Sequence, residues 1–399
     1  MLKTTPFHAR TAPLVLGQTW RRWAGYGVAS SYDWLHDREY AAIRNAAALL
    51  DVSPLYKYHI TGRDAARLLD RMVTRNVAKL KDGQVMYTGW CDAHGKMMDD
   101  GTISCLGEGR YRLTSADPSY RWLHQNAFGL DVRIDDVSGI VGALALQGPL
   151  AREVLVHATE DASDSSIANL KYFRVAPARI SAIDVEISRT GYTGDLGYEI
   201  WIPASDALHV WDALMRAGAD YGLTPTGIWA LDAARIEAGL VMADVDYTGA
   251  HHAVIESQKS SPFELSLDWT VNLDKGPFNG RDALAAEHQR GPAWRFVGIE
   301  VDWDSFEALF AAVGLSPSLP TIAWRTSVPI YRSGKQIGYA SSGCWSPLLK
   351  KYIALAHIEA PHFAPDTSVE IEVTVEHQRK RANAWVRKLP FFDPERKKA

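Results

Sequence analysis

The sequence predicts an α+β fold that becomes mostly β toward its C-terminal end. Two patterns support this prediction. Residues 38–50 place apolar side chains on one helical face. Residues 369–375 alternate valine or isoleucine with glutamate or threonine, which is typical of a half-exposed strand. Charge, glycine and proline interrupt the pattern at 286–296, so we expect one region over 1–285 and a mostly β domain over 286–399.

The other expected elements follow from the same two periodicities. A capping sequence at Thr61–Asp64 predicts that a helix follows it. The apolar run 139–146 predicts a buried strand. In chain order we expect a helix at 38–50, strands at 84–90, 101–106, 110–115 and 139–146, helices at 150–157, 205–219 and 226–240, and an inserted helix and loop at 303–321.

Composition limits the classes of function. The chain has 399 residues, 47% of them apolar, and a net charge of −4. It can therefore form a packed core, and we expect it to bind neither nucleic acid nor a membrane surface. The apolar run at 139–146 is far shorter than a membrane span, and no secretory signal is expected. The three widely spaced cysteines lack a C-x-x-C pair, which predicts a cytoplasmic protein without a disulfide or zinc framework.

The run Arg189–Ile200 (R-T-G-Y-T-G-D-L-G-Y-E-I) is the most informative stretch of the chain. It has a glycine at every third position from Gly191 to Gly197, and glycine lets a ligand approach the main chain closely. Strand alternation then places Glu199 and Trp201 on one face. By itself the run predicts a glycine-rich hairpin, whose glutamate either is solvated or faces a ligand.

Five stretches, in the same order along the chain, resemble the glycine cleavage T-protein family of folate-dependent aminomethyltransferases and their demethylase relatives. They are 82–100 (D-G-Q-V-M-Y-T-G-W-C-D-A-H-G-K-M-M-D-D), 189–200, 231–240 (L-D-A-A-R-I-E-A-G-L), 261–284 and 336–356. The resemblance implies a three-lobed α+β fold with a C-terminal antiparallel β-barrel around a central hole. It also implies that this hole binds tetrahydrofolate.

The resemblance assigns roles to individual residues. Glu199 matches the family's pterin-binding glutamate, and a carboxylate can accept two parallel N–H bonds from such a heterocycle. Tyr87 and Tyr192 match aromatic residues that line the pocket. Asp100 falls on the catalytic aspartate, which can act as a base or balance positive charge near the folate N5. Arg235 matches an arginine expected to meet an anionic part of folate or substrate.

Other residues are expected around the substrate on weaker grounds. Tyr56, Trp90, His252 and Trp345 are aromatic or polar residues near glycine turns or near departures from the family pattern, and we expect them to line the substrate pocket. Neighbouring residues on a strand point in opposite directions, and no third ligand follows His251-His252 at metal spacing, so no metal site is expected.

Departures from the T-protein pattern at 51–56 and 244–252 favour the family's branch that acts on free substrates. The leading prediction is therefore a tetrahydrofolate-dependent methyltransferase or demethylase for a small methylated compound, with a lipoyl carrier protein an unlikely partner. One alternative is a glycine cleavage aminomethyltransferase that acts on such a carrier. A non-enzymatic folate-binding accessory protein is disfavoured, because no cysteine between Cys105 and Cys344 can supply the K-G-C-x-x-G-Q-E-type motif of that group.

Overall fold

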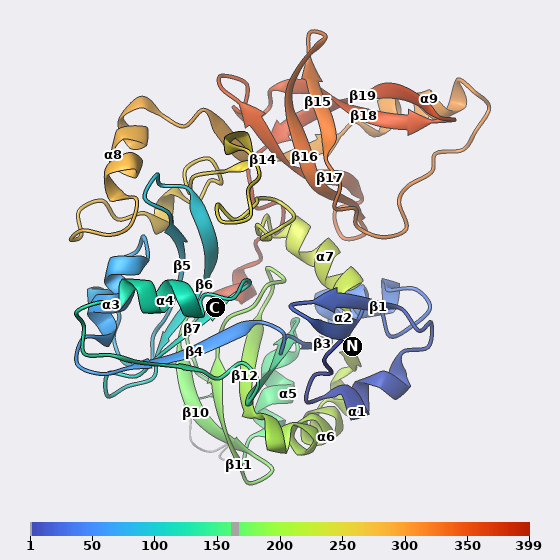
Figure 1. Ribbon diagram of the computed structural model, residues 1–399. Coiled ribbons are helices and arrows are strands. Elements are labelled where there is room, and N and C mark those ends of the chain that lie inside the picture. Colours follow the sequence, from blue (N-terminus) through green and yellow to red (C-terminus); the bar gives the residue numbers. More distant parts are fainter. Residues whose placement is uncertain (1, 161–166) are drawn as a thin grey trace.

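The computed structural model describes residues 2–160 and 167–399, and its fold is the α+β arrangement with a closed C-terminal barrel that the sequence predicts (Figure 1). The chain begins with α1 (His8–Thr11) and a two-stranded sheet of β1 (Trp20–Trp23) and β2 (Tyr26–Ala29). Within the described residues, no helix is long and apolar enough to span a membrane.

The first large sheet has six strands and is antiparallel except for its last pair. Their order is β10 (Val175–Ile180), β11 (Ile183–Ser188), β12 (Gly197–Pro203), β9 (Val141–Gln147), β3 (Ala47–Asp51) and β13 (Leu223–Pro225). Helices α5 (Ala151–Ala158) and α6 (Ala207–Ala217) pack on one face, while α2 (Asp37–Asn45) and α7 (Ile228–Glu237) share a core with the other.

The second sheet has five strands and carries much of the site. Their order is β5 (Val85–Cys91), β6 (Met97–Cys105), β7 (Tyr111–Ser115), β4 (Tyr56–Thr61) and β8 (Arg133–Asp136). The apolar faces of α3 (Ala65–Met72) and α4 (Tyr120–Asn126) cover this sheet. Farther along the chain, a largely irregular segment after α7 leads to α8 (Arg281–Arg290).

The barrel closes through six antiparallel strands at one end of the molecule (Figure 1). Their order is β14 (Trp294–Val301), β17 (Lys351–Glu359), β16 (Lys335–Ser346), β15 (Val328–Arg332), β18 (Ser368–Val375) and β19 (Gln378–Arg387). Helix α9 (Trp303–Ala311) forms within the expected insertion and packs on β19 through Phe306 and Phe310.

The expected helix at 38–50 is too long. The helix ends at Asn45, and residues 47–51 form β3 in the interior of the six-stranded sheet. Its first four residues, Ala47 to Leu50, are all buried. Alanine and leucine favour helices, but a run that is apolar on both faces suits a central strand, and tertiary packing decides between the two.

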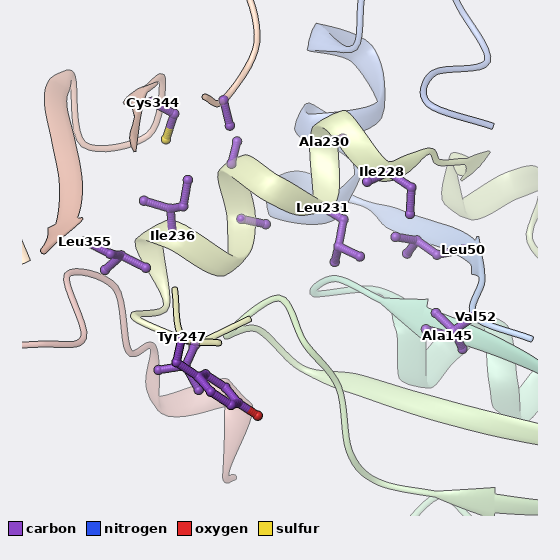
Figure 2. Packing of buried hydrophobic residues seen from close by; sticks show 14 of the residues in the cluster. Leu50, Val52, Ala145, Ile228, Ala230, Leu231, Ile236, Tyr247, Cys344 and Leu355 are labelled. Carbon is purple, nitrogen blue, oxygen red and sulfur yellow. The ribbon is translucent and has the colours of Figure 1, made fainter. Parts of the chain in front are cut away.

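Helix α7 connects the barrel with the six-stranded sheet. Figure 2 shows Leu231 on this helix beside Leu50 of β3, and Ile236 beside Leu355 of β17. Apart from Trp229, every residue of α7 is buried, including the charged ones. The barrel and the two sheets are thereby held around one central space.

Candidate functional site

A cavity of about 2090 Å³ lies between the two large sheets, the barrel and the C-terminal segment. The five-stranded sheet contributes Tyr87 and Asp100, and the glycine-rich run contributes Tyr192 and Glu199. Residues from the barrel side, among them Phe296, complete the wall. Four of the five stretches that resemble the T-protein family, 82–100, 189–200, 231–240 and 261–284, therefore contribute to the cavity wall.

Asp100 lies on β6, in the cavity wall, and both of its carboxylate oxygens accept phenolic hydrogen bonds. Tyr87 donates to Oδ2 at 2.9 Å, and Tyr247 donates to Oδ1. Burial raises the pKa of Asp100, and the two phenols lower it in part. Burial and the charge of Asp100 raise the pKa of both tyrosines well above its usual value, so they remain donors. The carboxylate is thus fixed in position and able to exchange a proton.

The neighbouring Asp99 faces away from the cavity, as strand alternation requires. It is buried, and its two oxygens accept the backbone N–H groups of Asp100 at 2.8 Å and Asp117 at 2.9 Å. Burial and the nearby Asp100 carboxylate raise the pKa of Asp99 well above its usual value. Asp99 therefore holds the backbone of β6 and of the turn after β7.

Glu199 lies on β12, half-buried in the wall contributed by the other sheet. Its Oε2 accepts a hydrogen bond from the Thr190 hydroxyl, and no other hydrogen bond reaches this carboxylate from the residues that the structure describes. Burial raises its pKa, while the Thr190 hydroxyl and the charge of Arg112 oppose that shift. Arg112 is buried 4.1 Å above the Trp201 ring and pairs with Glu186. One oxygen of Glu199 thus stays available to an N–H donor.

Aromatic side chains form much of the wall between the two carboxylates. Tyr192 donates its hydroxyl to the Val241 carbonyl, which fixes its ring. Tyr87 stacks on Trp269, with ring centroids 5.8 Å apart and planes 26° apart, and Trp269 is 60% exposed. Flat rings of this kind suit a heterocycle.

The structure brings together only part of the predicted set. Asp100, Glu199, Tyr87, Tyr192 and Tyr56 line the cavity. The other four residues have different surroundings, described next, and do not line it.

Arg235 is fully buried and pairs with Asp246, with Asp232 at 3.7 Å. Trp90 is in the core of the five-stranded sheet. Trp345, on β16, packs edge-on against Trp303 at 5.4 Å. His252 pairs with the carboxylate of Asp117, which does line the cavity.

Sequence reasoning missed Tyr247, Trp269 and Asp117. Tyr247 is buried and follows directly on the Asp244–Asp246 stretch, so its signal was an aromatic residue beside two acidic ones. Asp117 was missed as a partner of the histidines because it lies 135 residues from His252 in the sequence.

Comparisons with known proteins find family models, relatives and a solved structure that are similar to this chain. Residues 7–275 match the family model described as the GCVT N-terminal domain, and residues 311–393 match that of the glycine cleavage T-protein C-terminal barrel domain. An aminomethyltransferase of Bacillus pumilus is 33% identical over 98% of this chain and 99% of its own. A trimethylamine-oxide aldolase of Ruegeria pomeroyi is 35% identical over 99% of this chain but 48% of its own. The glycine cleavage system aminomethyltransferase T of Bartonella henselae shares the fold, with a TM-score of 0.81 at 24% identity over 98% of this chain and 99% of its own.

These relatives correct two predictions. The leading prediction of a demethylase for a free methylated compound is wrong, because relatives that span nearly the whole of both chains are aminomethyltransferases. The prediction that a lipoyl carrier protein is an unlikely partner is wrong for the same reason.

The physical reason is that the two stretches that depart from the T-protein pattern, 51–56 and 244–252, include buried residues that hold the fold together. Ser53 is buried and hydrogen-bonds to Asp51, while Asp246 is buried against Arg235. Packing requirements of this kind say little about the substrate.

Proposed function

The chain belongs to the glycine cleavage T-protein family, and from that premise we propose that it is a tetrahydrofolate-dependent aminomethyltransferase acting on a lipoyl carrier protein. The observation that carries the proposal is the pairing of two carboxylates across one cavity. Glu199 and Asp100 come from different sheets, and both line this space.

The residues present fit a folate. Glu199 offers a carboxylate oxygen to an N–H donor in a wall that is otherwise largely aromatic and apolar. The rings of Tyr87 and Tyr192 can contact the faces of a pterin. Arginine and lysine side chains also line the cavity, among them Arg75, Arg174 and Lys398, and can meet the anionic glutamate end.

When bound, tetrahydrofolate supplies the N5 amine as the nucleophile for the aminomethyl carbon. Asp100 would take up the proton that this nitrogen loses, or balance positive charge beside it. Tyr87 and Tyr247 hold the carboxylate in one orientation while it does so. In the overall transfer the carbon would exchange its bonds to the carrier's sulfur and to its own nitrogen for bonds to the folate N5 and N10, so that the sulfur would leave as a thiol and the nitrogen as ammonia.

The test is turnover with a carrier. Purified protein is mixed with tetrahydrofolate and a lipoyl carrier protein loaded with the aminomethyl group, and methylene-tetrahydrofolate and ammonia are measured. We expect both products in equal amounts, and neither when the carrier lacks its lipoyl group. Folate binding without any product from the loaded carrier would reject the proposal.

A further inference from the structure

A second group of side chains lies at the edge of the same cavity. Asp117 follows β7, and His251 and His252 belong to the loop that leads away from Tyr247. The Nε2 atoms of His251 and His252 lie 3.5 Å and 3.0 Å from Oδ2 of Asp117. The centroids of the two imidazole rings are 4.0 Å apart. Two imidazoles therefore converge on one carboxylate oxygen.

These separations suit ligands of a metal ion. Two ligand atoms, each about 2.1 Å from an ion, lie roughly 3.0 Å apart at a right angle and roughly 3.4 Å apart at a tetrahedral angle. The two measured distances, 3.0 and 3.5 Å, are close to these values. All three ligand atoms fall within 4.8 Å of one another. Small rotations of the side chains would admit an ion between them.

The backbone around the three residues is fixed. The Asp117 N–H donates to Asp99 at 2.9 Å, which anchors the turn to β6. In the histidine loop, the Ala250 N–H donates to the Met97 carbonyl at 2.7 Å, which anchors that loop to the same strand. Two segments far apart in the sequence are thus held against one strand, so the ligand set does not depend on a free loop.

Charge and access also suit a cation. The charge of Asp244 acts on Asp117 and on both histidines, so a second nearby carboxylate adds to the negative potential around the group. The side chains of His251 and His252 are 33% and 48% exposed, and that of Asp117 is 19% exposed. An ion can therefore enter from solvent, and part of its coordination sphere would remain open.

We propose that Asp117, His251 and His252 form a binding site for a divalent first-row transition metal. Two imidazole nitrogens and one carboxylate oxygen suit zinc, iron, nickel or copper, whereas magnesium and calcium prefer all-oxygen sites. Sequence spacing gave no reason to expect a metal, because the third ligand comes from a distant segment. The site depends only on these three side chains and not on the proposed transferase activity.

The experiment measures metal binding directly. Full-length protein is stripped with EDTA, dialysed, and titrated with zinc chloride by calorimetry, and a parallel cobalt titration follows visible absorption. The test variants are His251→Ala/His252→Ala and Asp117→Asn. His209→Ala is the matched control, because His209 is an exposed histidine on α6 in another part of the molecule.

Wild type and His209→Ala should bind one equivalent of zinc. Loss of an outer-shell partner alone lowers affinity about 10–100-fold, so the double histidine variant should lose at least that much. Cobalt bands should vanish in the same variants.

Circular dichroism checks the fold of every variant. If the double variant unfolds, His252→Ala replaces it, because that side chain is largely exposed. Absence of zinc binding by wild type, or equal binding by a folded histidine variant, would overturn the proposal.

Discussion

Replacement of Asp100 by asparagine separates binding from chemistry. The carboxylate accepts one phenolic hydrogen bond on each oxygen. Asparagine keeps the shape but has a single acceptor oxygen, so one phenol must reorient. A hydrogen bond to a charged group is worth about 1.5–3 kcal/mol, and relief of burying a charge opposes its loss, so stability should change by less than about 3 kcal/mol.

Turnover should change far more than stability. The amide can neither take a proton from an amine nor balance its charge, and a positioned acid or base contributes about 10²–10⁴-fold. We therefore expect Asp100→Asn to bind tetrahydrofolate within a few-fold of wild type, by calorimetry, while single-turnover formation of methylene-tetrahydrofolate falls by that factor.

Asp99→Asn is the matched control. Asp99 lies on the same strand and faces away from the cavity, where its oxygens hold two backbone N–H groups. The Asp99→Asn substitution should lower the melting temperature more than it lowers the rate of methylene-tetrahydrofolate formation. If Asp99→Asn were inactive and Asp100→Asn active, the assignment of the catalytic carboxylate would be refuted.

Three further substitutions test the same geometry. Glu199→Gln should weaken tetrahydrofolate binding roughly tenfold to hundredfold by calorimetry. Burial raises the pKa of Glu199 in the folded protein above its unfolded value of about 4.3, so ionisation of Glu199 lowers the free energy of unfolding as pH rises from there. Unfolding of the ligand-free variant should therefore show a gain over wild type that is larger at about pH 8 than at about pH 4, and a constant difference would contradict this. Tyr247→Phe removes a hydrogen bond that lowers the pKa of Asp100, so the ascending, acid-side limb of the pH–rate profile should move to higher pH; an unchanged profile would show that Tyr247 does not tune this carboxyl. Gly101→Ala would place a Cβ 1.9 Å from the Thr114 carbonyl oxygen, so the β6–β7 pairing must shift, and unfolding by urea should show a loss of about 1–3 kcal/mol; wild-type stability would mean that the pairing adapts without cost.

Periodicity predicted the α+β class and three strands of the five-stranded sheet, β5, β6 and β7, because apolar alternation reflects burial on one face. It gave no prediction for β4 and β8 of the same sheet. It failed at residues 47–51, where both faces are buried and alternation disappears. For such segments the sequence carries no local distinction between helix and strand.

The residues of the candidate site also include some whose placement the sequence predicted and some whose placement it did not. Strand alternation predicted that only one of Asp99 and Asp100 faces the cavity, and the resemblance to the T-protein family selected Asp100. Arg235, in contrast, carries a charge on a helix that is buried on nearly all sides, and its partner Asp246 lies beyond the end of that helix. No pattern in residues 228–237 shows that the chain folds back in this way. The contact between Asp117 and the two histidines could not be predicted for the same reason.

The burial of α7 has a consequence for how the molecule unfolds. Asp232 forms a two-pronged ion pair with Arg325, Asp246 links Arg235 to Ser341 and Ser342 of the barrel, and Glu237 joins Arg44 of α2 to Ser346 of β16. Separation of the barrel would break the Asp232–Arg325 ion pair, which costs several kcal/mol because Asp232 is buried. It would also take the serine hydroxyls away from Asp246 and Glu237, although these carboxylates would keep Arg235 and Arg44 as partners. The barrel and the sheets should therefore melt in one cooperative transition, and a chain cut before the barrel should not keep its native fold.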